Sequence, residues 1–216
     1  MAGIMSSDHA ACAFCLYDAA INDEPETLVS LLEQSPEIIN APGDDEGGTA
    51  LHIGAWKDRC NIVGLLLDRG ANLNLQDTAG FTPLLHAARD SSVRMVDLLL
   101  SRGADPTISN MFGVTPLMIA AGWAKLENVR RLLQESAVVN TINAQDKDGE
   151  TALHRACNSH NYHGNEKMRR DIIDIVQLLL DNGGDPSVID NDNCTALDVA
   201  CEFGPEECIT LMGGEL

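Results

Sequence analysis

Three side chains near the amino terminus have residue types that can bind zinc. His9, Cys12 and Cys15 follow one another at intervals of three residues. A structural zinc site needs four ligands, and no second close pair of cysteine or histidine residues stands nearby. We therefore expect these side chains to pack the first helix, and we expect no metal site in the chain.

Two further groups of residues have side chains that could do chemistry. His160 and His163 could bind a ligand or titrate near neutral pH, but solvated loop residues are the more common case. Cys194, Cys201 and Cys208 stand seven residues apart, and two of the three fall at apolar positions of a repeating pattern. We expect them to be core cysteines.

No catalytic motif occurs in the sequence. It contains no P-loop, no dinucleotide-binding glycine pattern, no nucleophile elbow and no HExxH motif. Aspartate and glutamate total 33, so some adjacent carboxylates are expected from composition alone. The sequence therefore predicts a protein that is not an enzyme and uses no cofactor.

The charge of the chain is strongly negative, with 33 acidic and 14 basic residues and a net charge of −19. This field repels phosphate groups, so we expect neither nucleic acid nor an anionic membrane as a partner. It favours a basic protein surface, although acidity that serves only solubility is an equal alternative. No apolar run is long enough to span a membrane, and the first residues do not have the pattern of a signal peptide. Most of the seven cysteines fall inside apolar helix patterns, as reduced cysteines do, and this predicts a cytoplasmic or nuclear protein.

Five similar phrases, each opened by a threonine, recur along the chain. The first three stand 33 residues apart and read TALHIGA, TPLLHAA and TPLMIAA; TALHRAC and TALDVAC follow after short insertions. Their threonines are Thr49, Thr82, Thr115, Thr151 and Thr195. A leucine-rich apolar run follows each of the first four phrases, and a turn with glycine follows most of these runs. Such self-similarity indicates a repeat architecture.

Local physical chemistry explains the phrase. The threonine is suited to cap a helix, because its hydroxyl can accept a hydrogen bond from a free backbone N–H. Pro83 and Pro116 follow their threonines at the first helical position, where the missing N–H costs nothing. The leucine runs predict the buried stripe of a second helix, which Gly70, Gly103 and Gly183 end in the left-handed conformation.

The period of 33 residues and the T-P-L-H-x-A wording resemble the ankyrin repeat, and the resemblance covers nearly the whole chain. It implies an all-α solenoid of helix pairs with β-hairpin fingers, in about six units including both caps. We expect one domain over 13–212 between tails at 1–12 and 213–216. Its units are an N-terminal cap (13–46), repeats at 47–79, 80–112, 113–148 and 149–192, and a C-terminal cap (193–212). In the family, the histidine at the position of His52 and His154 helps to connect one repeat to the next.

The chain departs from the family pattern in several places. Asp58, Ser91 and Ala124 replace the glycine after the first helix, and a left-handed alanine there costs about 1 kcal/mol. Three extra residues precede Thr151. Eleven more fall within 160–171, and we expect this insertion to bulge outward as a loop, where function often resides.

The resemblance also predicts a protein-binding surface on the first helices and fingers. The positions seven and eight residues after each threonine include both tryptophans of the chain, and aromatic and arginine residues often anchor interfaces. The predicted binding residues are Trp56, Lys57, Arg89, Asp90, Trp123 and Phe203 on the helices, and Phe81, Met111 and Phe112 on the fingers. The alternative is that each tryptophan only covers the adjacent repeat.

These observations predict a protein–protein interaction module, as an adaptor, inhibitor or scaffold. The acidic fingers and the apolar finger residues indicate a basic, partly apolar partner, and we expect the unbound chain to be a monomer. Two alternatives stay open: an assembly chaperone or regulatory subunit of a large complex, and the recognition domain of a longer enzyme or effector. Asn74 aligns with an asparagine that hydroxylases modify in some ankyrin proteins.

Overall fold

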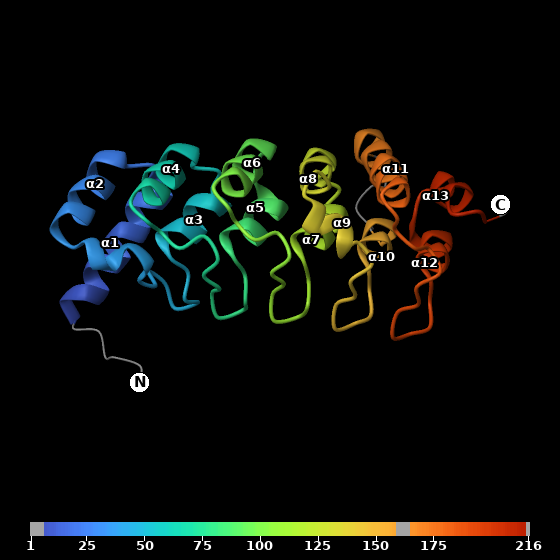
Figure 1. The fold of residues 1–216 in the computed structure, drawn as a ribbon, viewed down its shortest axis with the longest axis horizontal. Helices are drawn as coiled ribbons and strands as arrows, with labels where there is room; N and C mark the ends of the chain where they lie inside the picture. The colour runs from blue at the N-terminus through green and yellow to red at the C-terminus, as the bar shows by residue number, and fades with distance from the viewer. Residues whose placement is uncertain (1–6, 159–164, 215–216) are drawn as a thin grey trace. The chain divides into compact units, whose positions relative to one another are not determined.

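The computed structural model describes residues 7–158 and 165–214, with side chains from residue 11 onward. It divides into two compact units, Met1–Asp105 (unit 1) and Pro106–Leu216 (unit 2). In the described residues the fold is nearly all helical, with α-helices α1 to α13 and no β-strand (Figure 1). The predicted all-α class is confirmed.

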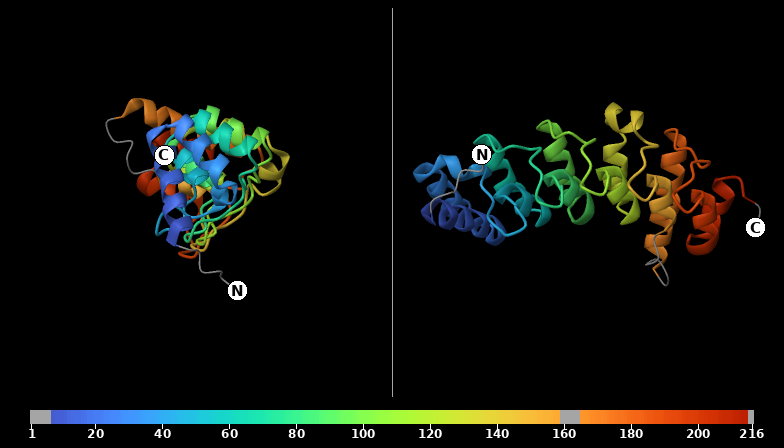
Figure 2. Two further views of the ribbon diagram at one scale, coloured as in Figure 1. Left: turned by 90° about the vertical axis from the view of Figure 1, so that its left-hand side faces the viewer. Right: turned by 90° about the horizontal axis from the view of Figure 1, so that it is seen from below.

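Unit 1 contains three helix pairs in two layers. Its elements are α1 (Ser7–Asn22), α2 (Pro25–Gln34), the 3-10 helix η1 (Pro36–Asn40), α3 (Ala50–Trp56), α4 (Cys60–Asp68), α5 (Pro83–Asp90) and α6 (Val93–Ser101). Helices α1, α3 and α5 pack side by side in one layer, and α2, α4 and α6 form the other (Figures 1 and 2).

Unit 2 repeats this arrangement. Its helices are α7 (Pro116–Gly122), α8 (Leu126–Leu132), α9 (Ser136–Asn140), α10 (Ala152–Cys157), α11 (Glu166–Asp181), α12 (Ala196–Phe203) and α13 (Glu206–Leu211). Helix α10 packs between α7 and α12, while α11 packs against α8 and α13. The first helices of unit 2 are short, with 7 residues in α7, 6 in α10 and 8 in α12 (Figure 1).

Helices α5 and α7 begin as the sequence predicts. The hydroxyls of Thr82 and Thr115 accept hydrogen bonds from the N–H groups three residues later, each at 3.3 Å. Pro83 and Pro116 are the first helical residues. A cap of this kind stabilises a helix by about 1 kcal/mol, which matters for helices of only two turns.

The core of each unit combines leucines of the second helices with small residues of the first. Leu66 and Leu99 are fully buried, and so are Ala55, Ala88 and Ala121. Burying one leucine side chain contributes about 2 kcal/mol, and the alanines let neighbouring first helices approach closely.

The turns after the first helices differ from one another. Asp58 and Ala124 adopt the left-handed conformation, with φ values of 58° and 51°, so both accept a strain that glycine would avoid. Ser91 is extended instead, with φ −97° and ψ 169°. Its hydroxyl donates to the carbonyl oxygen of Ala55, so this turn is held by a side chain from the adjacent repeat.

The fingers are turns closed by side chains rather than β-ladders, so the prediction of β-hairpins is not confirmed. In the described residues the only strand-like pairing is an isolated bridge between Ile189 and Thr195. In the finger before α5, Asp77 Oδ1 accepts hydrogen bonds from the N–H groups of Ala79 (3.0 Å) and Phe81 (2.8 Å). The same double acceptance occurs at Asp44, Asn110, Asp146 and Asp190.

Part of the predicted insertion loop is helical, which corrects the expectation for 166–171. Helix α11 begins at Glu166 and has 16 residues, against 9 in α4 and α6. Arg169 on the added turns donates to both carboxylate oxygens of Glu207 in α13, at 2.6 and 2.7 Å. The insertion continues the amphipathic pattern of α11, so helix extension satisfies its backbone groups better than a loop. His160 and His163 lie outside the described residues.

The cysteines only partly follow the expectation of core packing. All seven are free thiols. Cys157 and Cys208 are buried, and burial raises the pKa of Cys208 to about 12. Cys201 is exposed and Cys194 half-buried, so the core assignment is wrong for Cys201.

Candidate binding site

Four of the predicted binding residues meet at the ends of α3 and α5 in unit 1. Trp56, the last residue of α3, is 41% exposed, and its indole Nε1 donates to Asp90 Oδ2 at 2.9 Å. Lys57 places Nζ 4.2 Å from the centroid of the Trp56 ring, and Arg89 Nε lies 3.3 Å from Asp90 Oδ2. The indole is therefore fixed in place while much of its surface stays exposed.

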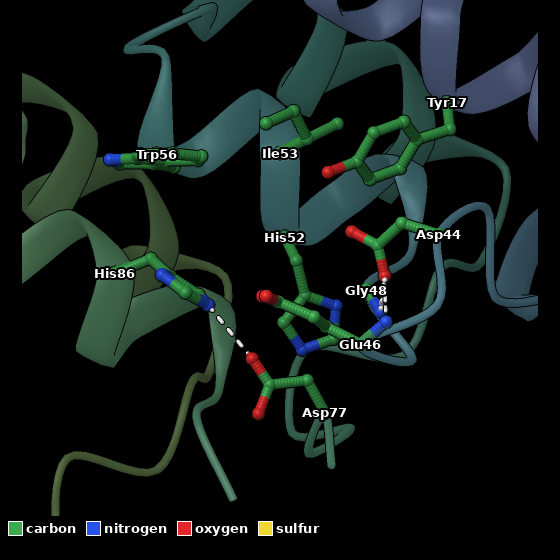
Figure 3. Close-up of a pocket in the computed structure, with 9 residues that line it drawn as sticks. All are labelled: Tyr17, Asp44, Glu46, Gly48, His52, Ile53, Trp56, Asp77 and His86. Atoms are coloured by element: carbon green, nitrogen blue, oxygen red, sulfur yellow. Dashed lines mark hydrogen bonds and ion pairs between the residues drawn. The ribbon is translucent and has the colours of Figure 1, made fainter. Parts of the chain in front are cut away.

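Beside Trp56 lies a small pocket, the Trp56 pocket, which is built entirely within unit 1 (Figure 3). It is lined by Tyr17, Asp44, Glu46, Gly48, His52, Ile53, Trp56, Asp77 and His86. Helices α1, α3 and α5 and two fingers each contribute part of the wall.

His52 forms the floor of the Trp56 pocket and joins two repeats. Its Nδ1 accepts from the N–H (3.1 Å) and hydroxyl (2.8 Å) of Thr49. Its Nε2 donates to the carbonyl oxygens of Leu75 (3.0 Å) and Phe81 (3.1 Å) in the next finger. Carbonyl oxygens only accept, so Nε2 carries a proton. Nδ1 accepts from the N–H of Thr49 and therefore carries none, so the ring is neutral. Burial lowers the pKa of His52, and neighbouring His86 adds to this effect.

His86 forms the opposite wall with Asp77. Its Nε2 lies 3.1 Å from Asp77 Oδ2, and its ring packs against Phe81 with centroids 5.0 Å apart. Burial lowers the pKa of His86 and outweighs the hydrogen bond to Asp77, which acts in the other direction. Near neutral pH the Asp77 carboxylate is therefore paired with an uncharged imidazole.

Tyr17 supplies the third wall from α1. Burial raises the pKa of Tyr17, and a hydrogen bond to Asp44 adds to the increase, so the phenol stays protonated. The ring packs on Gly43, where an added Cβ would collide with Cβ and Cγ of Tyr17. A glycine in the linker is thus required to bring this aromatic ring to the pocket.

The Trp56 pocket has an uncompensated negative charge. Asp44, Glu46 and Asp77 contribute three carboxylates, and the Glu46 side chain points into the pocket in Figure 3. Among the described residues, no lysine or arginine forms an ion pair with any of the three.

A second pocket, the Trp123 pocket, lies at the same register position in unit 2. It is lined by Met118, Ile119, Gly122, Trp123, Glu150, Arg155 and Asn158. Arg155 Nε donates to Asp146 Oδ2 at 2.9 Å, and Arg155 Nη2 lies 3.4 Å from Glu150 Oε2. This pocket therefore contains its own cation. Trp123 is 49% exposed.

The remaining predicted residues are distributed over both units. Met111 and Phe112, at the tip of a finger in unit 2, are 52% and 54% exposed. Phe81 is half-buried against His86, and Phe203, at the end of α12, is also half-buried. Asn74 is exposed, and its Oδ1 accepts from the N–H of Asp105 at 3.0 Å, so it has a structural role.

Other chemistry has little support in the described part of the chain. Within 7–158 and 165–214, no group of three or more His, Cys, Asp or Glu side chains is arranged to hold a metal ion. The side chain of His9 lies outside the described residues. No helix in the same ranges is both long and apolar enough to cross a membrane.

Comparison with known families decides the identity of the fold. The family model described as ankyrin repeats (3 copies) matches residues 8–77, 84–167 and 141–214. The chain belongs to the ankyrin-repeat family. A second ankyrin model, described as many copies, matches residues 61–100. Ankyrin repeats are generally protein–protein interaction modules, and the fold is typically non-catalytic.

Known proteins are similar along most of this ankyrin array. The solved structure of the ankyrin repeat protein EF0377 matches with a TM-score of 0.78 and 29% identity, over 94% of this chain and 98% of that one. An ankyrin repeat domain from Acinetobacter baumannii AYE matches with a TM-score of 0.74 and 31% identity, over 91% and 95%. The protein named L-asparaginase from Dirofilaria immitis is 29% identical over 204 residues, which are 94% of this chain.

The curated relatives are much longer than this ankyrin array. The chain spans 32% of the Dirofilaria protein and 14% to 16% of two other curated relatives. The family match therefore concerns one part of each of those proteins.

Proposed function

We propose that this ankyrin-repeat chain binds another protein through the exposed ends of its first helices and through its fingers. The observation that supports this most directly is the exposure of Trp56, Met111, Phe112 and Trp123, each more than 40% exposed in a fold that buries most large apolar residues. Aromatic side chains held in a fixed position lose little entropy on binding, so they are effective anchors.

The proposed partner has a basic and partly apolar surface. The net charge of −19 attracts such a surface, and exposed aromatic and methionine side chains provide the apolar part of the contact. We propose that the unbound chain is a monomer, located in the cytoplasm or nucleus, with no catalytic activity of its own. An adaptor, inhibitor or scaffold role fits these properties.

The test is quantitative capture of partners by the wild-type chain and by the double variant W56A/W123A. Proteins that bind through these anchors are retained by the wild type and lost from the double variant, while circular dichroism shows an unchanged helical content. V93A, which removes an apolar side chain 38% exposed at the start of α6, is the matched control and should retain them. Equal capture by W56A/W123A and the wild type would contradict the proposal.

A second proposal is that the array serves as the recognition part of a larger protein. The matches cover only 14% to 32% of three longer curated relatives, including 32% of the protein named L-asparaginase. An immunoblot of native material tests this: a band far above 23.2 kDa supports it, and a band at that mass contradicts it. Stable co-elution with a large complex would instead support an assembly chaperone or regulatory subunit.

A further inference from the structure

We propose that the Trp56 pocket of unit 1 receives one basic side chain, a lysine or arginine of the partner protein. The inference rests on the proposed function and assigns it a specific recognition site. Its basis is the combination of an aromatic wall and three carboxylates, to which no lysine or arginine of the described residues is paired.

Unit 2 provides the internal precedent for this occupant. Arg155 stands four residues after Thr151, as His86 does after Thr82, and Asp146 and Asp77 each stand five residues before their threonine. In unit 2 the guanidinium at this position binds Asp146 and approaches Glu150. In unit 1 the equivalent carboxylate oxygen, Asp77 Oδ2, pairs with the imidazole of His86, whose pKa is lowered by burial, so no guanidinium balances the charge of Asp77.

The negative charge of the pocket is not required by the fingers that carry it. Asp44 and Asp77 close their turns with Oδ1 alone. Asn110 closes the corresponding turn in unit 2 in the same way, accepting from the N–H groups of Phe112 (2.9 Å) and Val114 (3.0 Å). An amide would therefore preserve the turn, so both carboxylate charges are available for recognition.

The aromatic rings suit the same occupant. Lys57 already holds its ammonium 4.2 Å from the centroid of the Trp56 ring, so this indole accepts a cation at its face. Asp90 fixes the indole through its N–H, and Gly43 allows Tyr17 to approach. An alkyl chain can pack between the rings while its charged end reaches Glu46 and Asp77.

The test is an NMR titration of the full chain labelled with 15N, observed at the indole Nε1–H signals. The chain has two tryptophans, so Trp123 serves as a control within the same molecule. The probes are the Nα-acetyl methylamides of lysine and arginine, with the norleucine derivative as the neutral control. We expect a saturable shift at Trp56 with lysine or arginine, none with norleucine, and none at Trp123.

Three variants test the source of the binding energy. D44N/D77N keeps both turns and removes two charges, and it should weaken probe binding at least about tenfold. E26Q/E33Q removes two charges from α2, away from the pocket, and should change the affinity less than about twofold. H86R places a guanidinium at the position of Arg155, so it should fill the pocket and abolish probe binding.

Several outcomes would overturn the inference. These are an unmoved Trp56 signal with both basic probes, an equal response to norleucine, or equal weakening in D44N/D77N and E26Q/E33Q. Saturation by CaCl2 or MgCl2 at lower concentration than by the basic probes would indicate a metal site instead. Unaltered probe binding by a correctly folded H86R variant would also contradict it. Failure here is distinct from failure of the proposed function, which is measured by partner capture with W56A/W123A.

Discussion

The Trp56 pocket and the Trp123 pocket are built at the same position of the repeat, yet they differ in charge. The first contains three carboxylates and two histidines with lowered pKa values. In the second, Arg155 is bound to Asp146 and lies close to Glu150. Where unit 1 has Asp44, unit 2 has Asn110.

The difference shows that the aspartate of a finger has two separable tasks. One oxygen closes the turn, as at both Asp77 and Asp146. At Asp77 and Asp146 the other oxygen faces the next first helix and pairs with the residue four positions after the threonine, which is His86 or Arg155. The first task maintains the repeat, whereas the second sets the charge of the surface available to a partner.

The largest effect is expected from removing the cation of unit 2. The Asp146 side chain is only 1% exposed, so R155A leaves a buried carboxylate without its ion pair and should destabilise the chain by about 3 kcal/mol. H86A, which removes a neutral hydrogen-bond partner in unit 1, should cost about 1 kcal/mol. Urea-induced unfolding monitored by circular dichroism measures both.

The conservative variant R155K keeps the charge but loses the geometry of the guanidinium, so its stability should fall between those of the wild type and R155A. Equal destabilisation by R155A and H86A would show that the two aspartates are not in different electrostatic environments.

The next largest change in stability is expected at the residue three positions after the threonine. H52L in unit 1 leaves Thr49 and the carbonyls of Leu75 and Phe81 without their hydrogen bonds, at a cost of about 2 kcal/mol. M118L in unit 2 loses only a weak bond from Thr115 N–H to sulfur (3.4 Å) and should cost less than about 0.5 kcal/mol.

The same urea experiment compares H52L with M118L, and L85M is a control at a position that is already apolar. A similar loss in H52L and M118L would refute the role of His52 as the tie between repeats.

A smaller change, which stabilises the chain, is expected in the turns that follow Trp56 and Trp123 in the sequence. A124G removes the strain of a left-handed alanine and should stabilise the chain by up to about 1 kcal/mol. D58G removes similar strain but also loses the 2.8 Å hydrogen bond from the Ser92 hydroxyl, so its net effect should be near zero. Thermal denaturation distinguishes the two, and a lower melting temperature for A124G would contradict this explanation.

The smallest expected effect is a pH dependence of the stability of the chain, which arises from two histidines in unit 1. His52 and His86 have lowered pKa values, so the unfolded chain takes up protons first as the pH falls below their ordinary value of about 6.5. Their contribution to stability is complete above that pH and is lost as the pH falls through the folded pKa values. Unfolding midpoints at pH 7.5 and 5.5 should differ less for H86Q than for the wild type, and an equal difference would exclude His86 as a source.

Much of the fold could be predicted because its signals are local. The threonine caps at Thr82 and Thr115, the prolines after them and the left-handed Gly70, Gly103 and Gly183 all lie where the repeat pattern places them. Each depends on backbone geometry within a few residues. The sequence also predicted the exposure of Trp56 and Trp123, because repeat register fixes which side of a helix a residue occupies.

Other features depend on competition between alternatives that the sequence leaves open. Residues 166–171 could form a loop or extend a helix, and the contact of Arg169 with Glu207 forms only when α11 and α13 pack together. Ser91 was expected at a glycine position, but its hydroxyl reaches Ala55 in the adjacent repeat and an extended turn results.

The sequence alone determined the repeat, its helix pairs, the positions of the two tryptophans and the negative charge of the chain. Each of these follows from periodicity, helix caps or composition, and none of them depends on how the helices pack. The tertiary structure alone brought Tyr17, Asp44, Glu46 and Asp77 around Trp56, in a pocket whose lining, among the described residues, includes no lysine or arginine. These residues come from separate repeats, and their common environment depends on packing that places side chains 60 residues apart in one cavity.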